Sequence, residues 1–266
     1  MRVFLSLLGT GTLVFIYAAF IEIEWLEITT HRLAWDGLQQ PIKILHVSDL
    51  HFRKVERRLD RTILAAMASL KPDLIVITGD SLDKRSSATS VRDFFSQLKA
   101  PLGVWVVPGN WDYWSEMKTQ GDNRLPGVLD GLSNIKLLQN EAVPIAENLW
   151  LVGMDDEIAG QPDQAKGWSK VPSAAGVIGL LHAPEGVRHF TDPRARLLLA
   201  GHTHGGQVRL PFFGPLWLPP GSGSFVQGWY DLRQGTRLYV NRGIGNSLWD
   251  IRFLCRPEIA VFELDP

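Results

Sequence analysis

The stretch Ile42-Lys43-Ile44-Leu45-His46-Val47-Ser48-Asp49-Leu50-His51 decides the fold. Its first six residues are mostly apolar and predict a buried strand, and the run ends in the polar cluster Asp49-Leu50-His51. Apolar runs that end in Gly, Asp, Asn or His recur along the rest of the chain. We therefore expect further strands over residues 73–78, 103–107, 149–154, 176–181, 196–200, 238–241 and 259–264.

Helical patterns lie between some of these strands. Apolar residues recur at helical spacing between residues 59 and 70, and again between residues 94 and 98, which predicts two amphipathic helices. Strands that alternate with helices are typical of a layered α/β domain. We expect this domain to cover residues 41–264.

The composition excludes several classes of protein. The chain has 266 residues, of which 45% are hydrophobic, so it can bury a large core and is not a disordered chain. Its 27 Lys and Arg residues nearly balance 28 Asp and Glu residues, so we expect no sequence-specific nucleic acid as a partner. Cys255 is the only cysteine, which excludes an internal disulfide and a Cys-rich zinc site.

Five polar clusters follow expected strands, at the position where open α/β sheets bind their ligands. Each cluster alone is typical of a turn or a helix cap, but their common position favours a metal site. Together they offer Asp, Asn and His side chains without a thiolate, a set that suits Mn, Fe, Zn or Co. Seven such ligands would serve two divalent ions that share one carboxylate. The clusters are Asp49-Leu50-His51, Gly79-Asp80, Gly109-Asn110, Leu181-His182-Ala183 and Gly201-His202-Thr203-His204.

The order of these clusters resembles that of the calcineurin-like metallophosphoesterase superfamily. The stretches 201–207 and 241–245 and the hydrophobic N-terminus resemble more narrowly its membrane-associated bacterial phosphodiesterase branch. The resemblance implies a four-layer α/β/β/α sandwich with two metal ions at one edge. It implies that the first ion is held by Asp49, His51 and His204, the second by Asn110, His182 and His202, and that Asp80 bridges them.

This ligand set predicts a hydrolase of phosphodiester or pyrophosphate bonds. The nucleophile would be a hydroxide that bridges the two ions, with Asp80, Asn110 and His202 as catalytic residues. The substrate would be a small-molecule or lipid-linked phosphoester. A narrower interpretation is a hydrolase similar to UDP-2,3-diacylglucosamine pyrophosphatase, in lipid A synthesis. The alternative from a different class is a non-catalytic metal-binding module on the same scaffold.

The third cluster departs from the pattern of the superfamily. It reads Gly109-Asn110-Trp111-Asp112, where the superfamily usually has Gly-Asn-His followed by Asp or Glu. An indole cannot deliver a proton near neutral pH, which favours pyrophosphate bonds or aryl esters over alkyl esters. Trp111 could also offer a flat apolar face for stacking a base or sugar. The alternatives are that Trp111 simply packs, with Asp112 or a mobile residue supplying the proton, or that the enzyme is crippled. We expect Arg53 and Trp111 to contact the substrate.

Residues 3–21 contain no charged side chain and predict a transmembrane helix, within an anchor over residues 1–22. A cleaved signal peptide and a buried or interfacial helix are the alternatives. Arg2 precedes the segment and Glu22 follows it, which favours an N-terminus in the cytoplasm. The expected location is the bacterial cytoplasmic membrane, with the catalytic domain outside the cytoplasm.

Residues 211–223 are rich in Pro, Gly and aromatic residues and predict a long loop. Its large apolar side chains would either contact an amphiphilic substrate or belong to the core. They are Phe212, Phe213, Leu216 and Trp217.

Overall fold

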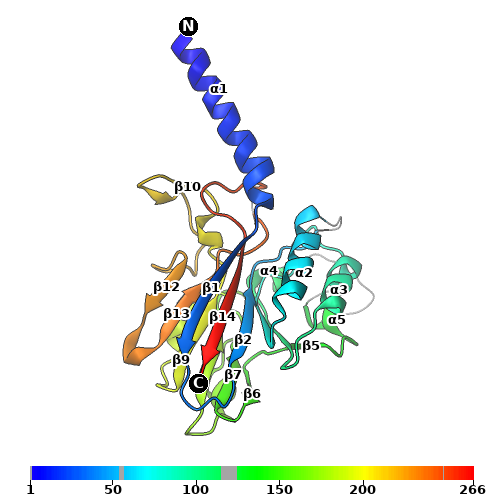
Figure 1. The fold of residues 1–266 in the computed structure, drawn as a ribbon, viewed down its shortest axis with the longest axis vertical. Helices are drawn as coiled ribbons and strands as arrows, with labels where there is room; N and C mark the ends of the chain where they lie inside the picture. Colours follow the sequence, from blue (N-terminus) through cyan, green and yellow to red (C-terminus); the bar gives the residue numbers. More distant parts are fainter. Residues whose placement is uncertain (1, 54–56, 115–124, 248) are drawn as a thin grey trace.

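The predicted strand over residues 42–47 is β2 (Ile42–Val47), an interior strand of one of two six-stranded sheets (Figure 1). The structure is a computed structural model that describes residues 2–53, 57–114, 125–247 and 249–266. The first sheet has the order β1 (Glu27–Ala34), β14 (Glu258–Asp265), β2, β3 (Leu74–Thr78), β4 (Val104–Val107) and β5 (Ile135–Leu137). The second has the order β12 (Gly228–Asp231), β13 (Arg237–Val240), β9 (Ala195–Ala200), β8 (Gly176–Leu180), β7 (Leu149–Gly153) and β6 (Glu141–Ala146).

The two sheets pack face to face through fully buried side chains. Ile44, Val76 and Phe262 of the first sheet belong to the same hydrophobic cluster as Ile178 and Leu199 of the second. β2, β3, β4 and β5 are parallel, as are β7, β8, β9 and β13. Strands buried on both faces read as continuous apolar runs, which is why these interior strands could be recognised in the sequence.

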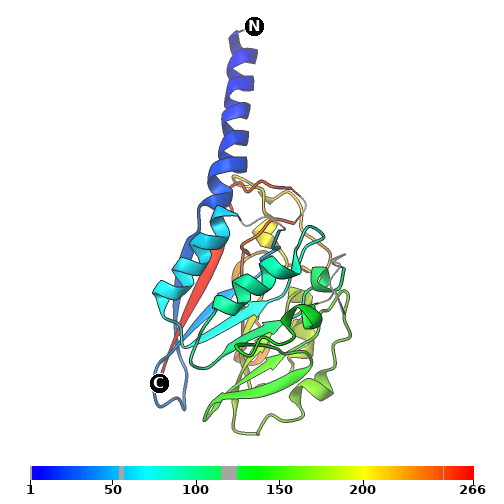
Figure 2. The same ribbon diagram turned by 90° about the vertical axis from the view of Figure 1, so that its right-hand side faces the viewer.

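Helices cover the outer faces of both sheets. α2 (Arg58–Leu70), α3 (Ala88–Gln97) and α5 (Leu125–Leu129) pack on the first sheet through a second hydrophobic cluster (Figure 2). α6 (Gln164–Trp168) and the 3-10 turn η3 (Pro184–His189) lie against the second sheet through a third. The predicted α/β sandwich is therefore confirmed.

The remaining elements are short and lie in the loops. They are α4 (Asn110–Trp114), the 3-10 turns η4 (His204–Gly206) and η5 (Arg233–Gly235), and the hairpin of β10 (Arg209–Leu210) and β11 (Gly214–Pro215). Both α4 and η4 begin at residues that the sequence analysis picked as metal ligands, immediately beyond β4 and β9.

The predicted transmembrane span over residues 3–21 is wrong. α1 (Arg2–Ile16) has 15 residues, or about 22 Å at 1.5 Å per residue, which is short of a hydrocarbon core of about 30 Å (Figure 1). The chain then continues as η1 (Tyr17–Ile21), a π-helical turn, and η2 (Glu22–Glu24). Ala18 is buried there, and its carbonyl oxygen accepts a hydrogen bond from the backbone N–H of Arg252 at 3.0 Å.

The second half of the expected anchor is thus attached to the folded domain. In the described parts of the chain, no helix combines the length and the apolar character needed to cross a membrane. The predicted location, in the cytoplasmic membrane with the catalytic domain outside the cytoplasm, depended on this anchor. That prediction is therefore wrong as well.

Candidate metal centre

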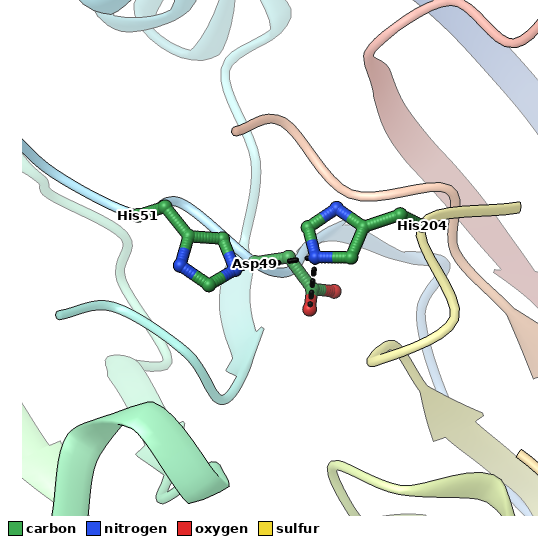
Figure 3. Close-up of side chains that lie close together, drawn as sticks. All are labelled: Asp49, His51 and His204. Atoms are coloured by element: carbon green, nitrogen blue, oxygen red, sulfur yellow. Dashed lines mark hydrogen bonds and ion pairs between the residues drawn. The ribbon is translucent and has the colours of Figure 1, made fainter. Parts of the chain in front are cut away.

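The first group of predicted ligands meets at one edge of the sandwich. Asp49 and His51 follow β2, and His204 follows β9 of the other sheet (Figure 3). The His51 Nε2 and His204 Nε2 atoms are 3.2 Å apart, and His204 Nε2 lies 3.5 Å from Asp49 Oδ1. All three side chains are buried, and their ligand atoms lie within 4.8 Å of one another. They form one group that can hold a metal ion.

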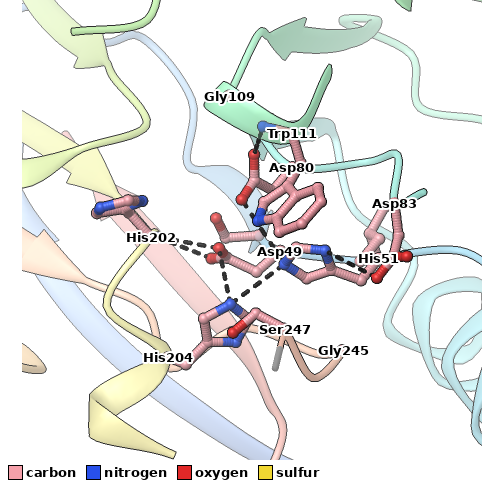
Figure 4. Close-up of polar contacts among 12 residues, drawn as sticks. Asp49, His51, Asp80, Asp83, Gly109, Trp111, His202, His204, Gly245 and Ser247 are labelled. Carbon is pink, nitrogen blue, oxygen red and sulfur yellow. Dashed lines mark hydrogen bonds and ion pairs between the residues drawn. The ribbon is translucent and has the colours of Figure 1, made fainter. Parts of the chain in front are cut away.

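A second group lies beside the first. His182 Nε2 is 3.2 Å from Asp80 Oδ2 and 3.2 Å from His202 Nδ1. Asp80 Oδ2 also lies 3.6 Å from His51 Nε2 (Figure 4). Because it contacts His182 as well, Asp80 stands between the two groups. Asn110 lines one cavity together with Asp80, His202 and His204, which we call the metal-ligand cavity. The buried Oδ1 atom of Asn110 has no hydrogen-bond partner within the described residues. The structure therefore brings all seven predicted ligands to one place.

The distances between the histidine nitrogens fit bound cations. Two ring nitrogens that face each other at 3.2 Å match an edge of a coordination shell, roughly 2.9–3.4 Å for metal–nitrogen bonds of about 2.05 Å. Backbone carbonyls also select the tautomers. His182 Nδ1–H donates to the Thr78 oxygen at 2.8 Å, and His202 Nε2–H donates to the Pro220 oxygen at 2.7 Å. In both rings the other nitrogen faces the site, and the neutral ring can bind an ion through it.

Burial keeps most of these imidazoles neutral, the form that binds metal. It lowers the pKa of His51 and of His202 to about 4 and that of His204 well below its usual value. Burial opposes charge on His182 as well, but the adjacent Asp80 carboxylate outweighs it and raises the pKa of that ring. Burial raises the pKa of Asp49 to about 6. A positive ion between the groups would offset the charge of both carboxylates.

The backbone at the site is left-handed at five of the predicted ligands. The φ angles are 52° at Asp49, 43° at His51, 50° at Asp80, 70° at His202 and 50° at His204. Non-glycine residues adopt this region at a cost, and such residues cluster at functional sites. The surrounding backbone holds the conformation, because the N–H of residue 51 donates to the oxygen of residue 80 at 3.0 Å.

The glycines of the clusters leave room for the ligands. A Cβ atom on Gly201 would lie 1.8 Å from Ser48 Oγ and 2.4 Å from Asp49 Oδ2. A Cβ atom on Gly109 would lie 2.4 Å from Asp80 Oδ1. Both distances are far inside van der Waals contact, so the two glycines are required for close approach of the chain segments that carry the ligands.

Trp111 lies at the wall of the metal-ligand cavity, which has a volume of about 220 Å³. Its backbone N–H donates to Asp80 Oδ1 at 2.8 Å, and its indole meets the His51 ring edge-on, with 6.2 Å between the ring centres (Figure 4). Asp112 turns away into the loop, where its carboxylate accepts hydrogen bonds from the N–H groups of Gly109 and Leu82. Burial, and after it the charge of Asp80, raises the pKa of Asp112 to about 7.

Arg53 lies outside this cavity. Its guanidinium forms an ion pair with Asp250, which also contacts Arg85, and its side chain lines a separate hollow together with Phe94. The structure thus places Arg53, which was expected to contact the substrate, at a surface ion-pair cluster.

Three supporting residues had no role assigned to them from the sequence. Asp83 Oδ2 lies 3.8 Å from His51 Nδ1, the ring nitrogen that points away from the metal-ligand cavity (Figure 4). A Cβ atom on Gly243 would lie 2.7 Å from the Cβ atom of Asp49, and the neighbouring Gly245 N–H donates to the Asp49 oxygen at 2.6 Å. In the sequence, the stretch 241–245 resembles the membrane-associated bacterial phosphodiesterase branch, but its residues do not indicate that it supports Asp49.

Comparison with known proteins finds bacterial relatives that are named as phosphoesterases or pyrophosphatases. The uncharacterized metallophosphoesterase YkuE of Bacillus subtilis is 32% identical, with 93% of this chain and 88% of the relative covered. The phosphodiesterase YaeI of Escherichia coli is 33% identical, with 93% of this chain and 92% of the relative covered. The UDP-2,3-diacylglucosamine pyrophosphatase LpxG of Chlamydia muridarum is 27% identical, with 97% of this chain and 95% of the relative covered.

The family model of the calcineurin-like phosphoesterases matches residues 42–206, the segment that runs from β2 through the last predicted metal ligand. The superfamily predicted from the sequence is therefore confirmed, and this chain belongs to the calcineurin-like phosphoesterase family.

Proposed function

We propose that this phosphoesterase hydrolyses phosphodiester or pyrophosphate bonds with two divalent metal ions. The observation that carries the proposal is the position of Asp80, whose Oδ2 lies 3.6 Å from His51 of one ligand group and 3.2 Å from His182 of the other. One carboxylate oxygen between two groups of buried ligands is the arrangement that a pair of ions sharing a ligand requires.

The proposed ligand roles follow these contacts. Asp49, His51 and His204 would hold one ion, Asn110, His182 and His202 the other, and Asp80 both. When bound, two such cations supply a water nucleophile of lowered pKa and neutralise charge on the phosphoryl oxygens. The donor set suits Mn, Fe, Zn or Co.

The residues of this chain keep the site rigid. His182 and His202 are fixed by hydrogen bonds to the carbonyl oxygens of Thr78 and Pro220, so their other ring nitrogens already face the centre. The Trp111 N–H holds one oxygen of Asp80 and leaves the other free between the ligand groups. A site that is formed in advance needs little rearrangement when substrate binds.

The indole of Trp111 sets a preference among leaving groups. It lines the cavity where members of the superfamily usually carry a histidine, and it has no proton to give near neutral pH. Both oxygens of Asp112 are engaged by backbone N–H groups, so Asp112 supports the loop. We therefore propose that the favoured bonds release a phosphate or an aryl oxide, which leave without protonation.

A lipid-linked pyrophosphate is the second candidate substrate, as in a hydrolase similar to UDP-2,3-diacylglucosamine pyrophosphatase in lipid A synthesis. LpxG of Chlamydia muridarum carries that name and aligns over 97% of this chain. Trp111 and Trp114 both line the metal-ligand cavity, with ring centres 6.0 Å apart and ring planes at 75°, and an indole face there supports a substrate with a ring to stack on it.

The test is turnover of bis-p-nitrophenyl phosphate by Mn-loaded protein, with metal content measured by native mass spectrometry. We expect two ions per chain and rapid hydrolysis, and a loss of about a hundredfold or more in Asp80→Asn. Asp192→Asn is the matched control, because that carboxylate is paired with Arg194 at the surface, at 2.7 Å. Metal bound in full without hydrolysis would instead favour a non-catalytic metal-binding module.

A further inference from the structure

A larger apolar cavity lies next to the metal-ligand cavity. It has a volume of about 480 Å³, within the range of about 300–1,000 Å³ that is usual for small-molecule sites. Its apolar walls are Val208, Leu216, Trp217, Trp249 and Ile251. Among the described residues that line it there is no Asp, Glu, Lys or Arg side chain. The apolar walls suit a hydrocarbon, and the lining offers no charged partner to a charged group.

The two cavities share part of their walls. His204, Trp217, Pro219 and Ser247 line both of them. His204 is also one of the proposed metal ligands, so the apolar cavity begins where the metal site ends. A molecule whose phosphoryl group sat at the metal ligands could extend directly into the apolar cavity.

The walls of the apolar cavity are tied together by hydrogen bonds. The N–H of Leu216 donates to the Val208 oxygen at 3.1 Å, and the side chain of Gln207 donates to the Trp249 oxygen at 2.7 Å. Because residues 207 and 208 are neighbours in the chain, these two bonds link the loop over residues 211–223 to the segment over residues 249–251. The cavity is therefore formed in advance of any ligand.

The apolar side chains around it are exposed, which is costly unless something covers them. Leu216 is 61% exposed, Trp217 54% and Trp249 68%. The alternative that the loop side chains belong to the core is therefore wrong for Leu216 and Trp217, and also for Phe212 and Phe213, which are exposed as well. Apolar side chains gathered around a hollow are typical of a binding site.

We infer that the apolar cavity binds an alkyl or acyl chain of the substrate while its phosphoryl group lies at the metal ligands. This inference rests on the proposed function, and it names the substrate class as amphiphilic phosphoesters. The two cavities are continuous, so one molecule can occupy both. Such a molecule must carry a hydrocarbon chain next to its phosphoryl group, which is why we choose an amphiphilic phosphoester as the occupant.

The size of the effect can be derived from hydrocarbon transfer. Each methylene moved from water into the cavity should tighten binding about fourfold, until the cavity is full. A chain that is too long should give no further gain. The expected signature is a rise of kcat/KM with chain length that ends in a plateau.

The experiment uses n-alkyl p-nitrophenyl phosphates from methyl to octyl, below their micellar concentrations, with the full-length Mn-loaded protein. The leaving group is the same throughout, so only the alkyl chain changes. We expect the octyl-to-methyl ratio of kcat/KM to be at least about a hundredfold in the unaltered protein. Leu216→Ser and Trp249→Ser should each reduce this ratio at least about fivefold. Phe212→Ser is the matched control, because Phe212 is fully exposed in the same loop and does not line the cavity.

A binding measurement separates this inference from the proposed function. n-Alkyl phosphonates carry no hydrolysable ester, and calorimetry should show the same dependence on chain length and the same loss in Leu216→Ser. Hydrolysis of bis-p-nitrophenyl phosphate without any chain-length dependence would overturn the apolar site and leave the proposed function standing. Chain-dependent binding without any hydrolysis would overturn the proposed function and leave the apolar site standing. A flat response together with a dimer that Leu216→Ser dissociates would assign the cavity to a second copy of the chain.

Discussion

Replacing Asp83 by asparagine removes a negative charge beside a proposed metal ligand while the shape of the side chain is kept. Asp83 Oδ2 lies 3.8 Å from His51 Nδ1, and both side chains are buried. The substituted amide would retain an oxygen to accept the hydrogen bond that Asp83 Oδ1 receives from the Arg85 N–H at 2.8 Å. The substitution therefore tests the charge next to His51 with little change in packing.

The distance gives the scale of the effect. Two unit charges 3.8 Å apart interact by about 4 kcal/mol at an effective dielectric constant of about 20. An imidazole that binds a cation acquires only part of a unit charge, and Arg85 neutralises part of the Asp83 charge. We therefore expect a loss of about 1.4–2.8 kcal/mol, which is a ten- to hundredfold weaker metal affinity.

Calorimetric titration of metal-free protein with Mn²⁺ measures this loss. Because His51 belongs to one ligand group, only one of two binding steps should weaken in Asp83→Asn. Asp250→Asn is the matched control, since Asp250 contacts Arg85 at 3.6 Å and is half exposed. Equal affinities in the two variants, with unfolding in urea unchanged, would refute a direct role of Asp83 in positioning His51.

Three further predictions concern the frame of the site. Gly201→Ala should cost about 1–3 kcal/mol in the free energy of unfolding and weaken metal binding, because the new Cβ atom meets Ser48 Oγ at 1.8 Å; urea unfolding and metal titration check this. Glu258→Gln should cost about 1.5–3 kcal/mol in the free energy of unfolding measured in urea, since Arg242 loses its buried carboxylate partner at 3.1 Å and keeps only the more exposed Glu27. Burial lowers the pKa of His46 to about 3, so the unfolded chain binds the extra proton, and the contribution of His46 to the free energy of unfolding should fall by about 2 kcal/mol between pH 7 and pH 5. The fall should be smaller in His46→Gln; an equal fall would contradict the assignment, with Glu258 and His31 as the charged and titratable groups nearby.

The strands that could be predicted are the interior ones. β2 coincides with the expected residues 42–47, and the other interior strands fall within a residue or two of their expected ends. The strands of the two large sheets that the sequence analysis missed are β1, β5, β6 and β12, which are the four edges. An edge strand pairs on one side and is only partly covered: β1 alternates between half-buried and exposed residues. Such a strand carries no continuous apolar run.

The candidate site was predictable where chain topology determined it. Asp49, Asp80 and His182 follow parallel strands, so their side chains meet at one edge of the sandwich. The position of Arg53 could not be predicted from the sequence, because it depends on Asp250, a partner 197 residues away in the chain. The N-terminal segment failed for the same reason: its apolar composition does not show that Ala18 bonds to Arg252.

The place of β14 in the first sheet has a consequence for synthesis. β14 lies between β1 and β2, with Ala34 of β1 opposite Asp265. A ribosome that adds about 5–20 residues per second makes β1 roughly 10–50 s before the strand it pairs with. During that interval the nascent β1 has no neighbour from its own sheet. β14 must therefore be synthesised before this half of the sandwich can close, whereas the parallel strands β2, β3 and β4 can assemble much earlier in synthesis.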